Sequence, residues 1–114
     1  MDTRALRAFI RLGRFPFLLS GFIPFTAGAL FGFLLGARFT PGEFLFGYAA
    51  MAAAHLSVHY SNDYFDADAD RFVETTAISG GSGVLAAHPG LKPAALAAAV
   101  ALMAASILIG SLFV

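Results

Sequence analysis

The chain has 114 residues, of which 59% are hydrophobic and only 12% are charged, and its mean hydropathy is +0.79. A soluble domain usually carries about 25% charged residues, so this composition excludes an ordinary soluble domain and indicates a membrane protein. The absence of cysteine excludes a disulfide framework, a thiolate metal site and a thiol nucleophile.

The N-terminal segment, residues 1–14, is basic and amphipathic, and we expect it to form a helix. Its arginines recur at spacings of three and four residues, which places them in one stripe along a helix. They are Arg4, Arg7, Arg11 and Arg14. Because the opposite face is apolar, the stripe favours a helix at the lipid headgroups. Attraction of substrate phosphates is the alternative role of the same stripe.

Three apolar stretches follow, each near the roughly 20 residues that a membrane-spanning helix requires. They cover residues 15–37, 44–62 and 93–114. Positive charges also precede the apolar core of a secretory signal, but such a core is shorter, and here two further stretches follow the first. We therefore predict an all-α transmembrane helical bundle, with three membrane spans in a single membrane domain. Because the third stretch ends with the chain, we expect this domain to be the N-terminal part of a larger bundle.

Lysine and arginine are concentrated on one side of this predicted bundle. The N-terminal segment holds four arginines and the loop segment 63–92 holds Arg71 and Lys92, whereas the turn between the first two spans holds Arg38 alone. Short loops rich in lysine and arginine face the cytoplasm. We therefore expect a multi-pass protein of the cell inner or plasma membrane, with a cytoplasmic N-terminus and a cytoplasmic 63–92 segment.

The stretch HYSNDYFDADAD, residues 59–70, closes the second span with four of the chain's seven acidic residues. At about 100° per residue on a continuing helix, Asp63, Asp66 and Asp70 share one face. Asp68 points to the other side. Like charges on one face repel, and they do so more strongly in the low dielectric near a membrane. Carboxylate oxygens suit Mg²⁺ or Ca²⁺, and Mg²⁺ often completes its shell with substrate phosphates. The pattern therefore indicates a cation site, for which Mg²⁺ with a diphosphate is a coherent occupant.

An EF-hand calcium loop is excluded for this segment. Such a loop beginning at Asp66 needs Gly at its sixth position and Glu at its twelfth, where this chain has Arg71 and Ala77. A solvated acidic loop is the plainest alternative, but ionisable residues placed against a membrane span are usually functional.

Two neighbouring features leave further alternatives open. His55, His59 and Asp63 have the i, i+4 spacing of a transition-metal site, although histidines at a helix end also serve in packing or in lining a substrate pocket. The glycine-rich stretch SGGSG, residues 79–83, has backbone N–H groups that suit a phosphate. It lacks the Lys-Ser/Thr ending of a Walker loop, and it serves equally well as a flexible turn.

The acidic stretch resembles a known family signature. Residues 62–70, NDYFDADAD, are similar without a mismatch to the N-D-x-x-D-x-x-x-D motif of the UbiA-type intramembrane prenyltransferases. Residues 14–30, RFPFLLSGFIPFTAGAL, resemble that family's first helix, although Phe15 displaces the expected proline by one position. SGGSGVL at 79–85, followed by a span that begins with proline, is most similar to the branch containing the 1,4-dihydroxy-2-naphthoate prenyltransferases of menaquinone synthesis. The Arg-Pro pair that follows the motif in many members is absent here.

The resemblance implies roles for particular residues. It implies that the catalytic, Mg²⁺-binding ligands of the diphosphate are Asp63, Asp66 and Asp70. It also implies substrate-binding roles for four further residues. Asn62 would orient the carboxylates, Arg71 would neutralise the leaving diphosphate, and His59 and Tyr64 would line the pocket.

The function that the resemblance implies is Mg²⁺-dependent transfer of a prenyl group from a prenyl diphosphate to an aromatic quinone precursor within the membrane. The expected partners are the prenyl diphosphate, the aromatic acceptor and the lipid bilayer, with no nucleic acid. Because family members are much longer and no second acidic cluster follows Glu74, we expect the 114-residue chain alone to show no transfer. The alternative is a non-enzymatic subunit of a membrane helical bundle, whose acidic helix end binds cations.

Overall fold

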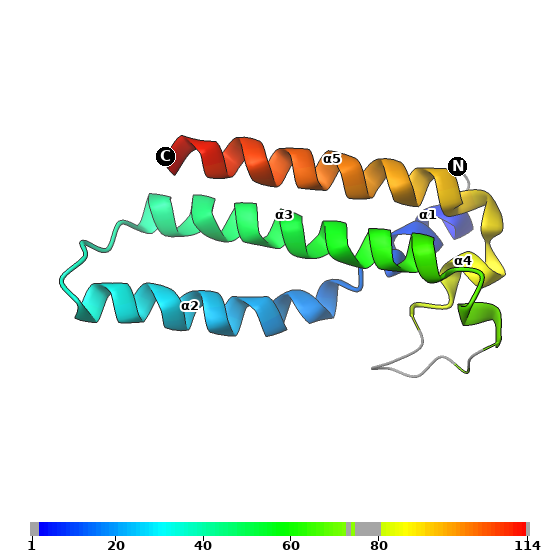
Figure 1. Ribbon diagram of the computed structural model, residues 1–114, viewed down its shortest axis with the longest axis horizontal. Coiled ribbons are helices and arrows are strands. Elements are labelled where there is room, and N and C mark those ends of the chain that lie inside the picture. The colour runs from blue at the N-terminus through cyan, green and yellow to red at the C-terminus, as the bar shows by residue number, and fades with distance from the viewer. Residues whose placement is uncertain (1–2, 73, 75–80, 114) are drawn as a thin grey trace.

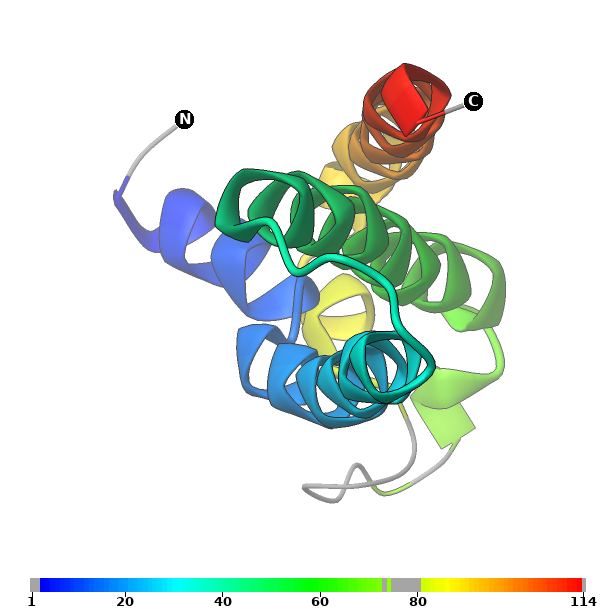
Figure 2. The ribbon, with the colours of Figure 1, turned by 90° about the vertical axis from the view of Figure 1, so that its left-hand side faces the viewer.

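The protein is described by a computed structural model that covers residues 3–72, 74 and 81–113, and it is all-α over those residues. Three long helices, α2 (Leu18–Leu34), α3 (Pro41–Asp66) and α5 (Lys92–Gly110), lie side by side with α3 in the middle (Figure 1). Seen from its end, the bundle has α2 and α5 on different sides of α3 (Figure 2). Consecutive long helices run in opposite directions along the bundle (Figure 1).

Shorter elements gather at the end of the bundle where α3 finishes. Helix α1 (Thr3–Leu12) and the single turn α4 (Val84–Ala87) both lie there (Figure 1). Short 3₁₀ turns complete the described chain: η1 (Phe15–Phe17), η2 (Asp70–Phe72), η3 (Pro89–Leu91) and η4 (Ser111–Phe113).

The helix boundaries follow from proline and glycine. Pro41 occupies the first turn of α3 and Pro93 the first turn of α5, where the missing N–H group costs nothing. The chain leaves α2 through Gly36, whose φ of 96° suits glycine. Pro24 lies inside α2, a position that membrane helices tolerate. The predicted spans 15–37, 44–62 and 93–114 thus correspond to these helices with shifted ends, and α3 is longer than predicted at both ends.

Helices α3 and α5 form the closest packing of the molecule. Ala95 and Ala99 of α5 are buried against α3, and the Ser57 hydroxyl of α3 donates a hydrogen bond of 2.7 Å to the Ala99 carbonyl oxygen. Small residues let two helix backbones approach closely, and serine hydroxyls bond between helices in membranes. The α3–α5 pair therefore has the packing chemistry of a membrane bundle.

Helix α1 packs on the same end of α3. Ala8 and Leu12 are buried, and the Tyr60 hydroxyl donates to the Phe9 carbonyl oxygen at 3.2 Å, while the two rings lie 5.2 Å apart. The arginines at positions 4, 7 and 11 remain exposed. The predicted basic, amphipathic N-terminal helix is thus present, with its charged stripe facing outward.

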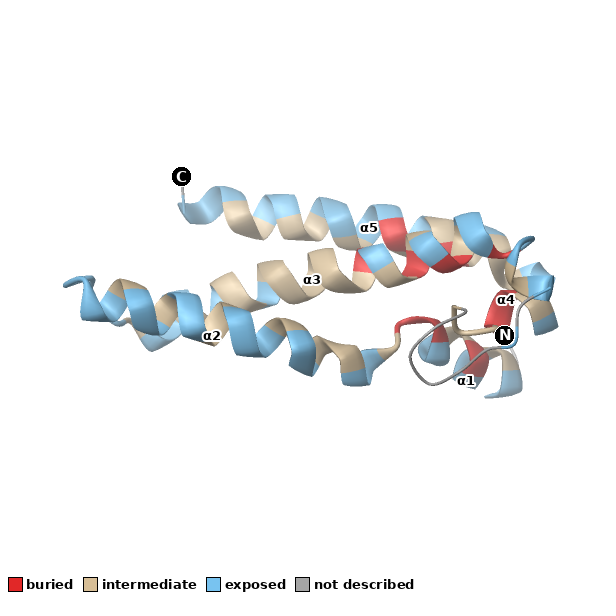
Figure 3. Ribbon diagram, turned by 60° about the horizontal axis from the view of Figure 1, so that its bottom comes forward, coloured by how far each residue is buried: buried red, intermediate tan, exposed pale blue. Residues whose placement is uncertain are grey.

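Two helical segments of the described chain are long and apolar enough to cross a membrane, Thr3–Leu34 and Pro89–Phe113. Neither is buried in a protein core, and the surface of α2 is largely exposed (Figure 3). Its most exposed large apolar side chains include Leu19, Ile23, Leu30, Phe31 and Leu34. So much apolar surface is a liability in water and suits contact with lipid. The third expected span, 44–62, is not among these segments and stays a prediction.

Candidate carboxylate site at the end of α3

One face of α3 turns toward η1 and the start of α2. His55 and His59 lie one turn apart on this face, and their rings stack with centroids 4.9 Å apart. His55 fits there because Gly21 has no side chain: a Cβ on Gly21 would lie 2.7 Å from the His55 Nδ1 atom. The His59 ring meets Phe17 edge-on at 5.7 Å. Its Nε2 atom is buried and has no hydrogen-bond partner among the described residues.

Asp63 continues this face one turn further and is nearly inaccessible, with 4% of its surface exposed. Both of its carboxylate oxygens accept the Ser82 backbone N–H at 3.3 Å, and the Ser82 hydroxyl also donates to the Asp63 Oδ2 atom. The Ser82 hydroxyl oxygen in turn accepts the Val84 N–H at 3.2 Å. A buried carboxylate is costly unless it is hydrogen-bonded, so Ser82 is the residue that lets Asp63 be buried.

Asp70 does not lie on a continuation of α3, and this part of the sequence-based prediction is wrong. The helix ends at Asp66, a turn follows, and Asp70 begins η2. The physical reason is the negative end of the helix dipole, which disfavours further carboxylates at the C-terminus of a helix.

The turn nevertheless brings Asp70 close to Asp63. Gly81 lies between the two side chains: a Cβ on Gly81 would collide with the Asp70 carboxylate and lie 3.5 Å from the Asp63 Oδ1 atom. Gly81 also has a φ of 67°, a conformation that glycine adopts without strain. Gly81 thus leaves room for the two carboxylates to approach each other. Ser79 and Gly80 of the glycine-rich stretch lie outside the described residues.

The pKa of Asp70 is shifted by burial and by the charged side chains around it. Burial raises the pKa of Asp70 above its ordinary value, and the negative charges of Asp63 and Asp66 add to this rise. The positive charge of Arg14 has the opposite effect on the Asp70 pKa. The carboxylate cluster, defined as Asp63, Asp66 and Asp70, is therefore an electrostatic unit that Arg14 partly neutralises.

Arg14 was assigned from the sequence to the stripe of the N-terminal helix, but the structure separates it from that stripe. Helix α1 ends at Leu12, and Arg14 follows with φ 44° and ψ 46°, an uncommon left-handed conformation for a residue with a side chain. Its guanidinium carbon lies 4.8 Å from the centroid of the Phe17 ring. The sequence pointed to Arg14 in two ways: it belonged to the stripe for which phosphate attraction was the alternative role, and it lies two residues before Pro16 of the first span.

Asp68 lies apart from the cluster and is exposed, although it lies in the turn after α3 and not on a continuing helix as predicted. It pairs with Lys92 at 3.2 Å and with Arg71 at 3.7 Å. Arg71, which was predicted to bind diphosphate, is thus placed beside Asp68.

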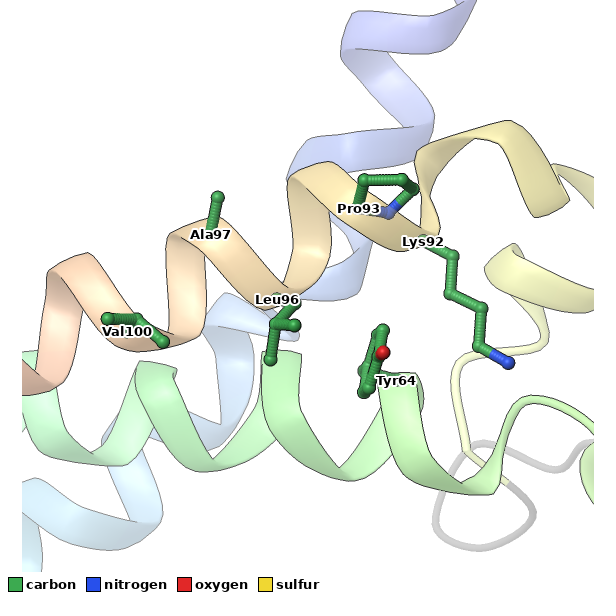
Figure 4. Close-up of a pocket in the computed structure, with 6 residues that line it drawn as sticks. All are labelled: Tyr64, Lys92, Pro93, Leu96, Ala97 and Val100. Atoms are coloured by element: carbon green, nitrogen blue, oxygen red, sulfur yellow. The ribbon is translucent and has the colours of Figure 1, made fainter.

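The remaining predicted residues are divided between two surfaces. Asn62 and Asp66 are exposed at the end of α3, whereas Tyr64 turns toward Lys92 and α5 (Figure 4).

The donor set suits a hard cation by its chemistry, because carboxylate oxygens are the preferred ligands of Mg²⁺. The approach of Asp63 and Asp70 around Gly81 brings two of the three predicted ligands together. Even so, no group of three His, Cys, Asp or Glu residues in the described chain is arranged to hold a metal ion. Comparison of the chain with protein-family models, with curated proteins and with solved structures gave no match.

Proposed function

We propose that the chain is part of an intramembrane prenyltransferase, which transfers a prenyl group from a prenyl diphosphate to an aromatic quinone precursor in a Mg²⁺-dependent reaction. The observation that supports this proposal best is the meeting of the Asp63 and Asp70 carboxylates around Gly81, next to helices with exposed apolar surfaces. Acidic oxygens beside an apolar surface suit a substrate with a charged head and a hydrocarbon tail.

The carboxylate cluster has the role of holding the cation. Asp63 and Asp70 are the first ligands, and Asp66 joins them from the last turn of α3. Bound Mg²⁺ would supply charge neutralisation and Lewis-acid polarisation of the diphosphate. Without a cation, the negative charges of the cluster would repel the same diphosphate.

Arg14 contributes the complementary charge. A guanidinium donates several hydrogen bonds in a rigid fork and recognises phosphate oxygens well. Its position within electrostatic reach of Asp70 suits a diphosphate bound between the cation and the N-terminal junction. Arg14 is thus proposed as a diphosphate ligand from the opposite side of the site.

The histidine face has the role of orienting the acceptor. The unpartnered His59 Nε2 atom can form a hydrogen bond to the hydroxyl group of an aromatic acceptor. The Phe17 ring, which lies against His59, excludes water from that side. An apolar, water-poor surface protects an electron-poor prenyl fragment from hydrolysis.

The test is Mg²⁺-dependent binding of a radiolabelled prenyl diphosphate to the 114-residue chain in nanodiscs. Binding is expected with Mg²⁺ and not with EDTA. Asp63→Asn and Asp70→Asn should each weaken binding about tenfold or more, as expected when a charged partner is removed. Asp68→Asn is the matched control, because Asp68 lies outside the cluster, and it should bind like the wild type.

Two results would contradict the proposal. Equal losses in the Asp63, Asp70 and Asp68 variants would show that the cluster has no special role. Binding of Mg²⁺ without any binding of prenyl diphosphate would favour the non-enzymatic membrane subunit with a cation-binding helix end.

A further inference from the structure

A second surface feature lies apart from the carboxylate cluster, in a groove of about 640 Å³ between the last turns of α3 and the first turns of α5. The residues that line it are Tyr64, Lys92, Pro93, Leu96, Ala97 and Val100 (Figure 4). Asp63 and Tyr64 are neighbours in the chain, but consecutive helical residues point about 100° apart. The groove and the carboxylate cluster therefore occupy different faces of α3.

The groove has one polar end and one apolar end. Lys92 and the ring of Tyr64 form the polar end, with the Lys92 Nζ atom 5.5 Å from the ring centroid (Figure 4). Leu96 and Val100 continue the groove along α5 (Figure 4), within a segment apolar enough to cross a membrane. Charge and polarity thus change along the helix axis as they do from a lipid headgroup to its acyl chain.

The positive charge of Lys92, at the polar end of the groove, is only weakly neutralised by neighbouring side chains. Lys92 shares Asp68 with Arg71, at 3.2 Å and 3.7 Å, and the Asp68 side chain is 74% exposed. An ion pair that is exposed to solvent contributes little to stability. A phosphate group can therefore replace Asp68 at Lys92, while Asp68 keeps its contact with Arg71.

We propose that this groove binds one anionic phospholipid of the bilayer, with the phosphate at Lys92 and an acyl chain along Leu96 and Val100. Tyrosine and lysine at the end of a membrane helix are typical of the headgroup level, and basic pockets between helices on the cytoplasmic side bind anionic headgroups. A second copy of the chain fits less well, because an apolar helix would bring no anion to Lys92 beyond Asp68, which this lysine already contacts. This inference does not depend on prenyl transfer.

The experiment measures lipid retention. The 114-residue chain is reconstituted in nanodiscs of phosphatidylcholine and phosphatidylglycerol, and retained lipids are counted by native mass spectrometry. The wild type should retain phosphatidylglycerol in preference to phosphatidylcholine. Lys92→Gln should reduce this preference about fivefold, the effect of one lysine at an anionic surface. Asp68→Asn should increase it, because the competing carboxylate is lost.

Arg38→Gln is the matched control, since Arg38 lies in the turn at the other end of the bundle, and it should retain lipid like the wild type. Helix content, measured by circular dichroism, should be the same in all variants. The proposal is overturned if the wild type shows no preference, or if Lys92→Gln keeps it in a folded protein. A loss in Arg38→Gln equal to that in Lys92→Gln would also overturn it, since it would indicate diffuse attraction to any basic residue.

Discussion

Asp63 and Asp70 are close neighbours, but their charges are supported differently. Asp63 is buried and accepts hydrogen bonds from the backbone and the side chain of Ser82. For Asp70, burial is the leading cause that raises the pKa, and nearby carboxylates add to it. Ionisation of Asp70 is therefore less favourable in the folded protein than in the unfolded chain, and a bound cation would offset this.

Asp70→Asn is expected to stabilise the metal-free protein at pH 7. Because the folded protein holds a proton on Asp70 more tightly than the unfolded chain, the stability from this group is fully present below its ordinary pKa of 3.8. That stability is lost as pH rises through the raised pKa. Thermal unfolding in EDTA should thus give a higher Tm for Asp70→Asn at pH 7, with the difference disappearing below pH 3.8.

Asp68→Asn serves as the control for this measurement. Asp68 has two cationic neighbours, so its neutralisation should give no gain in Tm at pH 7. An Asp70→Asn variant with the Tm of the wild type throughout this pH range would contradict the electrostatic account of the cluster.

Arg14→Gly separates the strain at this residue from its charge. Glycine adopts φ 44° and ψ 46° freely, whereas a residue with a Cβ atom pays about 1–2 kcal/mol in this region. The variant should therefore unfold at the same temperature as the wild type or higher. Binding of prenyl diphosphate should nevertheless fall about tenfold, because a charge-assisted contact is lost. Arg11→Gln, on the exposed stripe of α1, should bind normally, and retained binding in Arg14→Gly would exclude Arg14 as a ligand.

The sequence indicated which residues near the end of α3 form the acidic site, but it did not indicate which residues of other elements act on them. Asp68 does lie apart from Asp63, but not for the helical reason that the periodicity suggested, because α3 ends at Asp66 and Asp68 lies in the turn that follows. Ser82 follows Asp63 by 19 residues, and Arg14 reaches the cluster from another element. Such contacts depend on how the chain turns after α3, which no local pattern specifies.

At the scale of the elements, the molecule depends on the contact between α3 and α5. Small side chains bring these helices together, and one buried hydrogen bond joins Ser57 to the Ala99 carbonyl. The sequence predicted both helices from their apolar length and from Pro93. It did not predict the end of α3, because helical periodicity continues through Asp70 whereas the accumulated carboxylates oppose the helix dipole.

Two substitutions in this contact should differ in cost. Ser57→Ala removes one hydrogen bond and should destabilise the protein by about 0.6 kcal/mol, the usual value between membrane helices. Ala95→Leu forces a larger side chain into a fully buried position and should cost about 1–3 kcal/mol. Unfolding in increasing dodecyl sulfate, followed by circular dichroism, measures both.

Ala101→Leu is the matched control, because Ala101 is exposed on the same helix, and its unfolding curve should not move. If Ala101→Leu were as damaging as Ala95→Leu, the α3–α5 contact would not be the main source of stability.

At the scale of the whole molecule, most of the charged residues lie at one end of the bundle. The N-terminal helix, the end of α3 and the short α4 gather there, whereas the turn after α2 lies at the opposite end (Figure 1). The cytoplasmic orientation expected for the N-terminus and the acidic segment would require that α3, as well as α2 and α5, crosses the membrane.

Single introduced cysteines test this topology, since the natural chain has none. Ala37→Cys in the turn after α2 and His88→Cys near α4 are both at exposed positions. In intact cells, an impermeant maleimide should label Ala37→Cys only, and His88→Cys should become reactive after permeabilisation. Labelling of both residues from the same side would show that α3 does not cross the membrane.

The hydrogen bonds between Ser82 and Asp63 mean that cation binding would loosen the nearby backbone and not order it. A bound ligand ordinarily makes the nearby backbone more rigid, but here the carboxylate that would take up a cation already holds the Ser82 amide. A cation bound to Asp63 would compete with the Ser82 amide for the electron density of the same two oxygens and would weaken this hydrogen bond. We therefore expect the Ser82 amide to exchange its hydrogen faster in the loaded protein than in the empty one.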